Sequence, residues 1–155
     1  METESDSSNK ARIRQCALAS LGQREHTRKT LRQKLLKQIE APADVDAVIE
    51  DMVALGYLNE KRFTESLIRK RAHQGYGPRW IQQDLQQAGI GANDASIALD
   101  ESELDWNELA RALCQKKYRS RAVVDAKERA KRQRFLYSKG FTGEQIKAAE
   151  TQSES

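Results

Sequence analysis

The sequence contains no apolar run of the length that a membrane-spanning helix requires. Such a helix needs roughly 18 consecutive apolar residues, and none occurs in this 155-residue chain. The first ten residues, METESDSSNK, are polar and acidic, whereas a signal peptide combines basic residues with an apolar stretch. We therefore expect a cytoplasmic protein without a membrane partner.

Cysteine is scarce, and the common catalytic motifs are absent. Cys16 and Cys114 form no CxxC pair, which excludes a disulfide framework and fits a reducing compartment. No GxGxxG, P-loop or HExxH motif occurs. His26 and His73 are isolated, whereas zinc takes three or four closely spaced ligands, so we assign both to helix capping or the surface. We predict no catalytic residues, no metal and no cofactor, and therefore no enzyme.

Large apolar side chains are also few. Leu, Ile, Val and Phe make up 30 of 155 residues, a share that would suggest disorder if the net charge were high. The net charge is only +4, and the apolar residues keep a helical spacing. We expect a folded protein with a thin core, closer to several small bundles than to one large globule.

Helical periodicity runs through the whole chain, and no stretch alternates apolar and polar residues as a strand would. Alanine, with 19 copies, leads a composition rich in good helix formers. Residues that favour helix starts and helix ends separate the apolar stripes. The apolar stripes are Ile13, Cys16, Ala17, Leu21; Leu31, Leu35, Ile39; Val45, Val48, Ile49, Met52, Leu55; Phe63, Leu67; Ile81, Leu85; and Leu109, Leu113. The expected caps and stops are Thr27, Pro42, Gly56, Asn59, Gly75, Gly77-Pro78, Asp105 and the pair Thr142 and Gln145.

The apolar residues and helix stops recur with a period of about 50 residues. Leu35, Leu85 and Leu136 lie 50 and 51 residues apart, and we expect them to be equivalent core positions. Gly89-Ile90 and Gly140-Phe141 end two copies alike, whereas the first copy has Gln38-Ile39 at that place. We align Leu31, Ile81 and Arg132 in the same way, and Val48, Ile97 and Ile146 in the following short helix. A tandem helical array is the prediction, with a loose chance alignment of amphipathic helices as the alternative.

The predicted fold class is all-α, an elongated tandem array of three three-helix repeats with about nine helices. The expected divisions are a disordered or frayed tail at 1–10, repeats at 11–58, 59–104 and 105–150, and a polar tail at 151–155. A short turn before a basic helix also resembles helix-turn-helix DNA readers, although many helical pairs share that feature.

Charge is strongly segregated along the sequence. Residues 12–37 carry net +7 and residues 111–134 net +8, while residues 40–51 carry net −5 and residues 94–108 hold six acids and no base. Basic stretches of this density attract phosphate or an acidic protein groove. The alternative is a solvated face whose charges neutralise each other in the fold. We interpret the acids at 100–103 as a solvated turn.

The basic helices supply the candidate contacts to DNA or to a protein partner. Arg79 follows a Gly-Tyr-Gly-Pro turn at an expected helix start, where a helix N-terminus and an arginine together suit an anion. Tyr76 and Trp80 either stack at an interface or pack within their own bundle. The candidate binding residues are Lys70, Arg71, Arg79, Lys116, Lys117, Arg119, Lys131, Arg132 and Arg134.

Four segments carry more specific patterns. They are Arg24-Glu25-His26-Thr27 with Leu31-x-x-Lys34-Leu35; Gly56-Tyr57-Leu58-Asn59-Glu60-x-Arg62-Phe63; Gly75-Tyr76-Gly77-Pro78-x-x-Ile81-x-x-x-Leu85-x-x-x-Gly89-Ile90; and Arg134-Phe135-Leu136-x-x-x-Gly140-Phe141. Together they resemble the signatures of the RecX family over residues 11–149. The chain departs from the usual family pattern at Asn59, near which the family has Asp, and at Ile39, where many members have Gly.

The resemblance implies an all-helical fold of three tandem three-helix units and a regulatory role toward the RecA recombinase. RecX proteins bind RecA–DNA filaments in the helical groove, generally inhibit ATP hydrolysis and strand exchange, and limit filament growth. That activity belongs to homologous recombination, DNA repair and the SOS response. We expect a monomer with the RecA filament as partner and single- and double-stranded DNA as further partners. The alternative is a freestanding basic helical DNA-binding protein.

Overall fold

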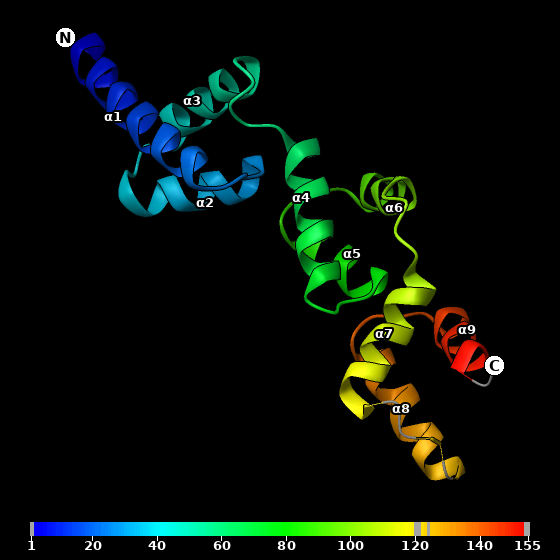
Figure 1. Cartoon of the computed structure of the whole chain (residues 1–155). Coiled ribbons are helices and arrows are strands. Elements are labelled where there is room, and N and C mark those ends of the chain that lie inside the picture. The colour runs from blue at the N-terminus through cyan, green and yellow to red at the C-terminus, as the bar shows by residue number, and fades with distance from the viewer. Residues whose placement is uncertain (1, 120–121, 124, 154–155) are drawn as a thin grey trace. The chain divides into compact units, whose positions relative to one another are not determined.

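The computed structural model describes residues 2–119, 122–123 and 125–153, with side chains described from residue 8 to residue 150. Within these residues nine helices and no strand are present, as the periodicity predicts (Figure 1). They are α1 (Glu2–Gln23), α2 (Arg28–Gln38), α3 (Pro42–Ala54), α4 (Glu60–His73), α5 (Pro78–Gln87), α6 (Ala92–Glu101), α7 (Trp106–Tyr118), α8 (Ala126–Ser138) and α9 (Gly143–Ser153).

The predicted caps are confirmed at the helix starts. Thr27 accepts the Thr30 N–H at 3.1 Å in a capping box before α2, and Asn59 Oδ1 accepts the Arg62 N–H at 2.9 Å before α4. Asp105 caps α7, Thr142 and Gln145 form a capping box at α9, and Pro42 opens α3. The sequence analysis missed Asp125, which accepts the Glu128 N–H at 2.8 Å and caps α8. Each cap satisfies backbone donors that the first helical turn leaves unpaired.

The chain divides into two compact units, and the boundary falls inside α4. The first unit comprises Met1–Ser66 with Gln87–Gly91, and the second comprises Leu67–Gln86 with Ala92–Ser155. In the first, α1 packs on α3, and the core contains Ile13, Ala17, Leu31, Leu35, Ile39, Val45, Val48, Ile49, Met52 and Leu58. In the second, α7 packs on α9 around a small core of Ala110, Leu136, Phe141, Ile146 and Ala149. Both cores are small clusters, as the low share of large apolar residues predicts.

The repeat alignment is confirmed at the three leucines and wrong in the helix that follows them. Leu35, Leu85 and Leu136 are all buried, and the starts of α3, α6 and α9 follow the same spacing as these leucines. Ile97, which the sequence alignment placed with Val48 and Ile146, is 45 % exposed. The equivalent buried residues are Val45, Ala95 and Ile146, because each is the fourth residue of its helix.

A backbone junction joins the start of α5 to the end of α8 within the second unit. The Gly77 N–H donates to Lys139 O at 2.7 Å, and the Arg79 N–H donates to Gly140 O at 2.9 Å. A Cβ on Gly77 would lie 2.5 Å from the Gly140 carbonyl carbon, and a Cβ on Gly140 would lie 2.5 Å from the Trp80 Cβ. Gly140 also has φ +98°, so both geometry and space require glycine there.

An equivalent junction lies within the first unit, where the residues after α5 meet the start of α2. Thr27 Oγ1 donates to Ala88 O, and Lys29 Nζ donates to Gln87 O at 3.0 Å. Gly89 corresponds to Gly140 in this contact, since its Cβ position would lie 3.0 Å from the Lys29 Cβ. Ile39, the residue at the same place in the first repeat, is extended with φ −136°. Its carbonyl accepts the Ala41 N–H at 3.0 Å, and a backbone with negative φ does not require glycine.

The two ends of the chain differ from the expected tails. Helix α1 begins at Glu2 and so includes nearly all of the segment 1–10 for which we expected a disordered or frayed tail. Helix α9 continues to Ser153, into the expected polar tail 151–155. Met1 and residues 154–155 lie outside the described residues.

Candidate functional site

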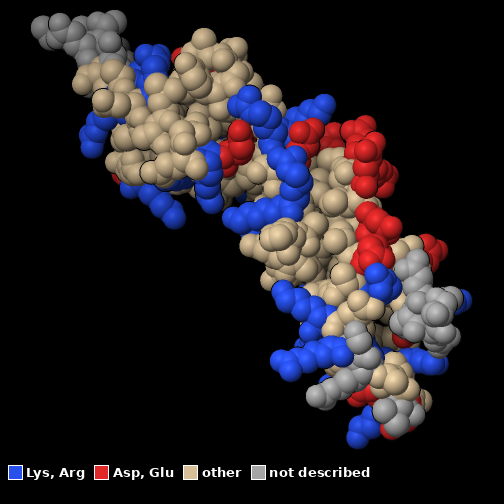
Figure 2. Space-filling view, viewed as in Figure 1, with Lys and Arg blue, Asp and Glu red and all other residues tan. Residues whose placement is uncertain are grey.

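All nine candidate cations lie in the second unit, on α4, α5, α7 and α8. Within this unit Lys and Arg gather at the end formed by α7 and α8, whereas Asp and Glu follow α6 and the segment leading to α7 (Figure 2). The sequence windows at 111–134 and 94–108 thus become two separate surfaces. The acids of the second window are Asp94, Asp100, Glu101, Glu103, Asp105 and Glu108.

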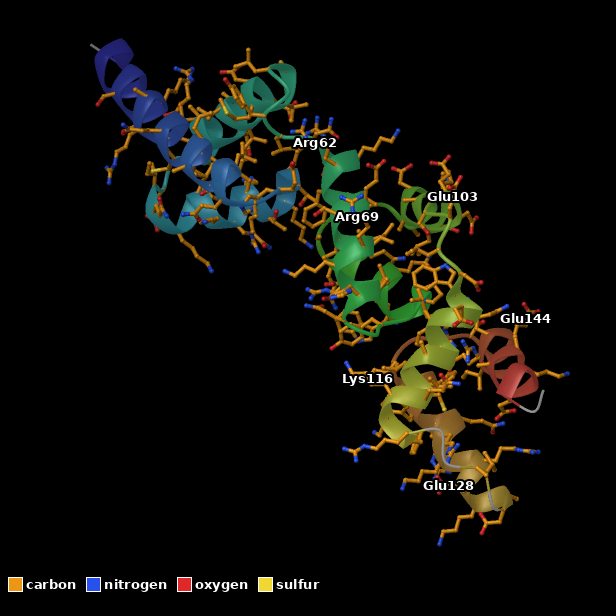
Figure 3. All side chains as sticks on the ribbon, viewed as in Figure 1. Arg62, Arg69, Glu103, Lys116, Glu128 and Glu144 are labelled. Carbon is orange, nitrogen blue, oxygen red and sulfur yellow. The ribbon has the colours of Figure 1, made fainter. Side chains whose placement is uncertain are left out.

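Five of the candidate cations are exposed and form no ion pair or hydrogen bond with another described residue. Lys70 lies in the last turn of α4, and Lys116 points away from α7 (Figure 3). Arg119 follows α7 in the left-handed conformation with φ +51°. Lys131 and Arg134 lie on the exposed side of α8. These five side chains are available for phosphate or for a partner's carboxylates.

The other four candidates are already engaged inside the protein. Arg71 Nε donates to Asp84 Oδ2 at 2.7 Å, and Arg132 Nε donates to Glu128 Oε1 at 3.2 Å. The Arg79 guanidinium lies 5.0 Å from the centroid of the Tyr137 ring. Lys117 Nζ lies 3.8 Å from the centroid of the Phe135 ring. We therefore assign these four primarily to holding the unit together.

Aromatic rings and cations alternate across the second unit in a way that the sequence analysis did not anticipate. The Tyr76 and Trp80 rings stack with centroids 3.8 Å apart, and Arg71 lies over Trp80 at 5.6 Å. Lys139 lies 5.0 Å from the Tyr76 ring and 6.0 Å from the Phe135 ring. Each such pair stabilises by about 0.5–1 kcal/mol at an exposed site. Of the two alternatives for Tyr76 and Trp80, packing within their own bundle is therefore the one observed, with the two rings stacked on each other.

The same alternation continues from α8 to the end of α7. Phe135 meets the Tyr118 ring edge-on at 6.0 Å, and Arg132 lies 4.6 Å from the Tyr118 centroid. Burial raises the pKa of the Tyr118 hydroxyl, so this ring stays neutral. The sequence did contain a signal for these cation–ring contacts, because each of these rings lies within a basic segment. Only the packing of α7 on α8 shows which cation meets which ring.

The predicted anion site at the start of α5 is wrong. The Gly77 and Arg79 N–H groups, which would have faced a phosphate, donate to the carbonyls of Lys139 and Gly140. The positive end of the α5 dipole therefore meets the carbonyl-rich residues after α8, an arrangement that also satisfies both helix ends. Sequence periodicity does not reveal this contact, because the partners lie more than 60 residues apart.

The histidines and cysteines have structural surroundings. Of the two predicted roles for His26, capping and surface, the structure favours capping: the residue is fully buried, and its Nδ1 lies 3.1 Å from Thr30 Oγ1 of the α2 capping box. His73 is exposed at the end of α4. Cys16 and Cys114 are half-buried beside the two cores. Burial raises the pKa of the Cys114 thiol, which disfavours the reactive thiolate.

The described part of the chain contains neither a candidate metal site nor a candidate membrane span. No group of three or more His, Cys, Asp or Glu residues there has the arrangement of a metal site. No described helix is long and apolar enough to cross a membrane.

Family models match three consecutive parts of the chain. Residues 14–52 match the first three-helix domain of RecX, residues 59–99 the second and residues 103–149 the third. The order of these matches agrees with the three predicted three-helix repeats.

Individual proteins give the same result. The Regulatory protein RecX of Halorhodospira halophila is 36 % identical over 137 residues, covering 88 % of this chain and 85 % of that protein. Its counterpart from Acidithiobacillus ferrooxidans is 40 % identical over 131 residues, covering 84 % and 83 %. The crystal structure of RecX from Lactobacillus salivarius has the same fold, with a TM-score of 0.79 at 22 % identity over 96 % of this chain and 98 % of that one.

Proposed function

The chain belongs to the RecX family of regulatory proteins, and from that premise we propose that it binds RecA–DNA filaments and limits their activity. The proposed effects are slower ATP hydrolysis, slower strand exchange and restricted filament growth. The single observation that carries the proposal is the match to all three RecX three-helix domains in order. The protein acts by binding, as a monomer in the cytoplasm, and uses no catalytic group.

We assign the filament contact to the five exposed cations at the α7–α8 end and on α4. Lys70, Lys116, Arg119, Lys131 and Arg134 present positive charge on a unit whose acid-rich segment 94–108 lies on another surface. In the filament such side chains meet bound DNA or acidic RecA surface. Contacts by successive helical repeats to successive protomers add as avidity, so each contact needs little affinity of its own.

The test is RecA ATPase activity on single-stranded DNA, measured against increasing amounts of the protein. We expect inhibition at protein concentrations below those that cover the DNA. The triple variant Lys116→Gln, Arg119→Gln and Arg134→Gln should need several-fold more protein for the same inhibition. A matched variant, Asp100→Asn, Glu101→Gln and Glu103→Gln, removes three exposed charges of the opposite sign and should inhibit at least as well as the unmodified protein.

The net +8 over residues 111–134 also favours a second candidate, a DNA-binding protein that acts without RecA. Such a protein would bind bare duplex as tightly as RecA-coated DNA, since phosphate contacts alone would supply its affinity. It would also inhibit only by competing for DNA. Equal affinity for both substrates, with no effect on preformed filaments, would rule out the RecA assignment.

A further inference from the structure

The turn between α3 and α4 exposes two large apolar side chains that a single glycine separates in the sequence. Leu55 is 67 % exposed and Tyr57 is 52 % exposed, while Leu58 is buried in the core of the first unit. We call residues 55–57 the Leu55–Tyr57 tip. The other exposed large apolar residues of the described chain, Leu18, Ile97, Val123 and Tyr137, are scattered over separate segments.

Every backbone N–H group of the tip is hydrogen-bonded. The Leu55 N–H donates to Asp51 O at 2.9 Å, and the Gly56 N–H donates to Val53 O at 3.0 Å. The N–H groups of Tyr57 and Leu58 both donate to Met52 O, at 2.9 and 3.1 Å. The turn is thus a satisfied helix C-terminus, and the buried Leu58 anchors it to the core.

Arg62 stabilises the tip by donating hydrogen bonds to its backbone carbonyls. Its Nη2 donates to Gly56 O at 2.9 Å and to Tyr57 O at 3.3 Å. Its Nε donates to Glu25 Oε1 at 3.1 Å, which ties the start of α4 to the segment before α2 (Figure 3). One guanidinium therefore connects three parts of the first unit at the base of the tip.

A rigid turn with two exposed apolar side chains is suited to binding another molecule. Leu55 and Tyr57 lie largely outside the core, whereas their neighbour Leu58 is buried in it. A Tyr on a preorganised turn provides a large contact area and loses little conformational entropy on binding. Tyrosine is also enriched among the residues that dominate protein–protein affinity.

The charges around the tip favour a protein partner over nucleic acid. Residues 52–59 carry no charge. The nearest acids are neutralised, since Asp51 pairs with Arg14 at 3.5 Å and Arg28 pairs with both Glu50 and Glu60. Arg62 is engaged with the turn itself. The tip thus offers apolar area within a segment that carries no charge of its own.

From these observations we infer that the Leu55–Tyr57 tip inserts into an apolar socket on the RecA protomer, as a protein contact distinct from the basic contact of the second unit. This inference rests on the proposed function. It divides the work between the two units: the tip supplies apolar protein–protein affinity, and the exposed cations supply charge attraction.

The test compares the variant Leu55→Ala with Tyr57→Ala against the matched control Leu18→Ala, which truncates an exposed leucine on α1. Affinity for preformed RecA–DNA filaments should fall by about tenfold or more in the tip variant, as for an interface hot spot. Affinity for bare DNA and the melting temperature should not change. The control should keep the affinity of the unmodified chain. A photo-crosslinking side chain at position 57 should give an adduct with RecA and none with DNA.

The outcomes separate the two claims. If the unmodified protein fails to bind filaments, the proposed function and the inference both fall. If it binds and the tip variant binds within twofold of it, only the inference falls. An equal loss of affinity for bare DNA, a crosslink to DNA, or a melting temperature that drops together with affinity would also overturn the inference, because each assigns the tip to another role.

Discussion

At His26, burial and neighbouring positive charge both lower the pKa of the imidazole. Burial foremost, and then the charges of Arg24 and Lys34, lower the pKa of the imidazole from 6.5 to about 4. Its Nε2 is buried and has no hydrogen-bond partner among the described residues. The folded protein therefore holds His26 neutral, in direct contact with the α2 capping box through Thr30.

This burial predicts an acid-sensitive stability. Because the folded pKa is below the unfolded one, His26 imposes no penalty above pH 6.5, and stability falls as the pH drops from 6.5 to about 4. The full loss is about 3 kcal/mol. Urea unfolding at several pH values should show this slope in the unmodified protein and lose it in His26→Gln. The exposed His73→Gln is the control, and equal slopes in both variants would contradict the prediction.

The aligned leucines are the second test at the residue scale. Leu85 is fully buried, so Leu85→Ala should lower the free energy of unfolding by about 2–5 kcal/mol, as for other buried leucines. Ile97→Ala, which truncates an exposed residue, should change it little. Denaturant titration followed by circular dichroism measures both. An unchanged midpoint for Leu85→Ala would show that the repeat register is wrong.

At the scale of elements, two glycines should respond in opposite ways to replacement by alanine. Gly140 follows the C-cap of α8, and Gly143 follows the N-cap of α9. Gly140→Ala places a methyl group 2.5 Å from the Trp80 Cβ at φ +98°, which should cost well over about 1 kcal/mol. Gly143 opens α9 and has no atom within 4 Å of its Cβ position. Gly143→Ala should therefore stabilise by about 0.4–1 kcal/mol. Thermal unfolding of both variants tests the α5–α8 junction, and equal melting temperatures would argue against it.

The elements also show which parts of this structure a sequence can reveal. Helix starts were predictable at Thr27, Asn59 and Asp105 because each cap is a local interaction within four residues. The register of the repeats followed from the spacing of buried leucines. The anion site at the start of α5 was wrongly predicted because the N–H groups there meet carbonyls of residues 139–140, a long-range contact with no periodic signature. Long-range contacts also engage Arg71, Arg79 and Lys117, so the sequence did not separate them from the cations without a partner.

At the scale of the whole molecule, a net charge of +4 conceals two surfaces of opposite sign in the second unit. Under the proposed function, the basic end would attract an anionic filament and the acids along α6 would repel it, so the two surfaces would orient the unit during encounter. Lys117 and Arg132 contribute to this field although they are held by aromatic rings. The exposed cations can add direct contacts.

The salt dependence of binding measures these direct contacts. Each phosphate contact that is lost should flatten the slope of log affinity against log salt by about 0.7–0.9. The variant Lys116→Gln, Arg119→Gln and Arg134→Gln should thus bind RecA–DNA filaments more weakly and with a shallower slope. Neutralising Asp100, Glu101 and Glu103 should leave the affinity unchanged or increase it. Fluorescence anisotropy on labelled filaments from 50 to 200 mM salt, ~fourfold in concentration, gives both slopes. A slope unchanged in the basic variant would exclude these side chains from the filament contact.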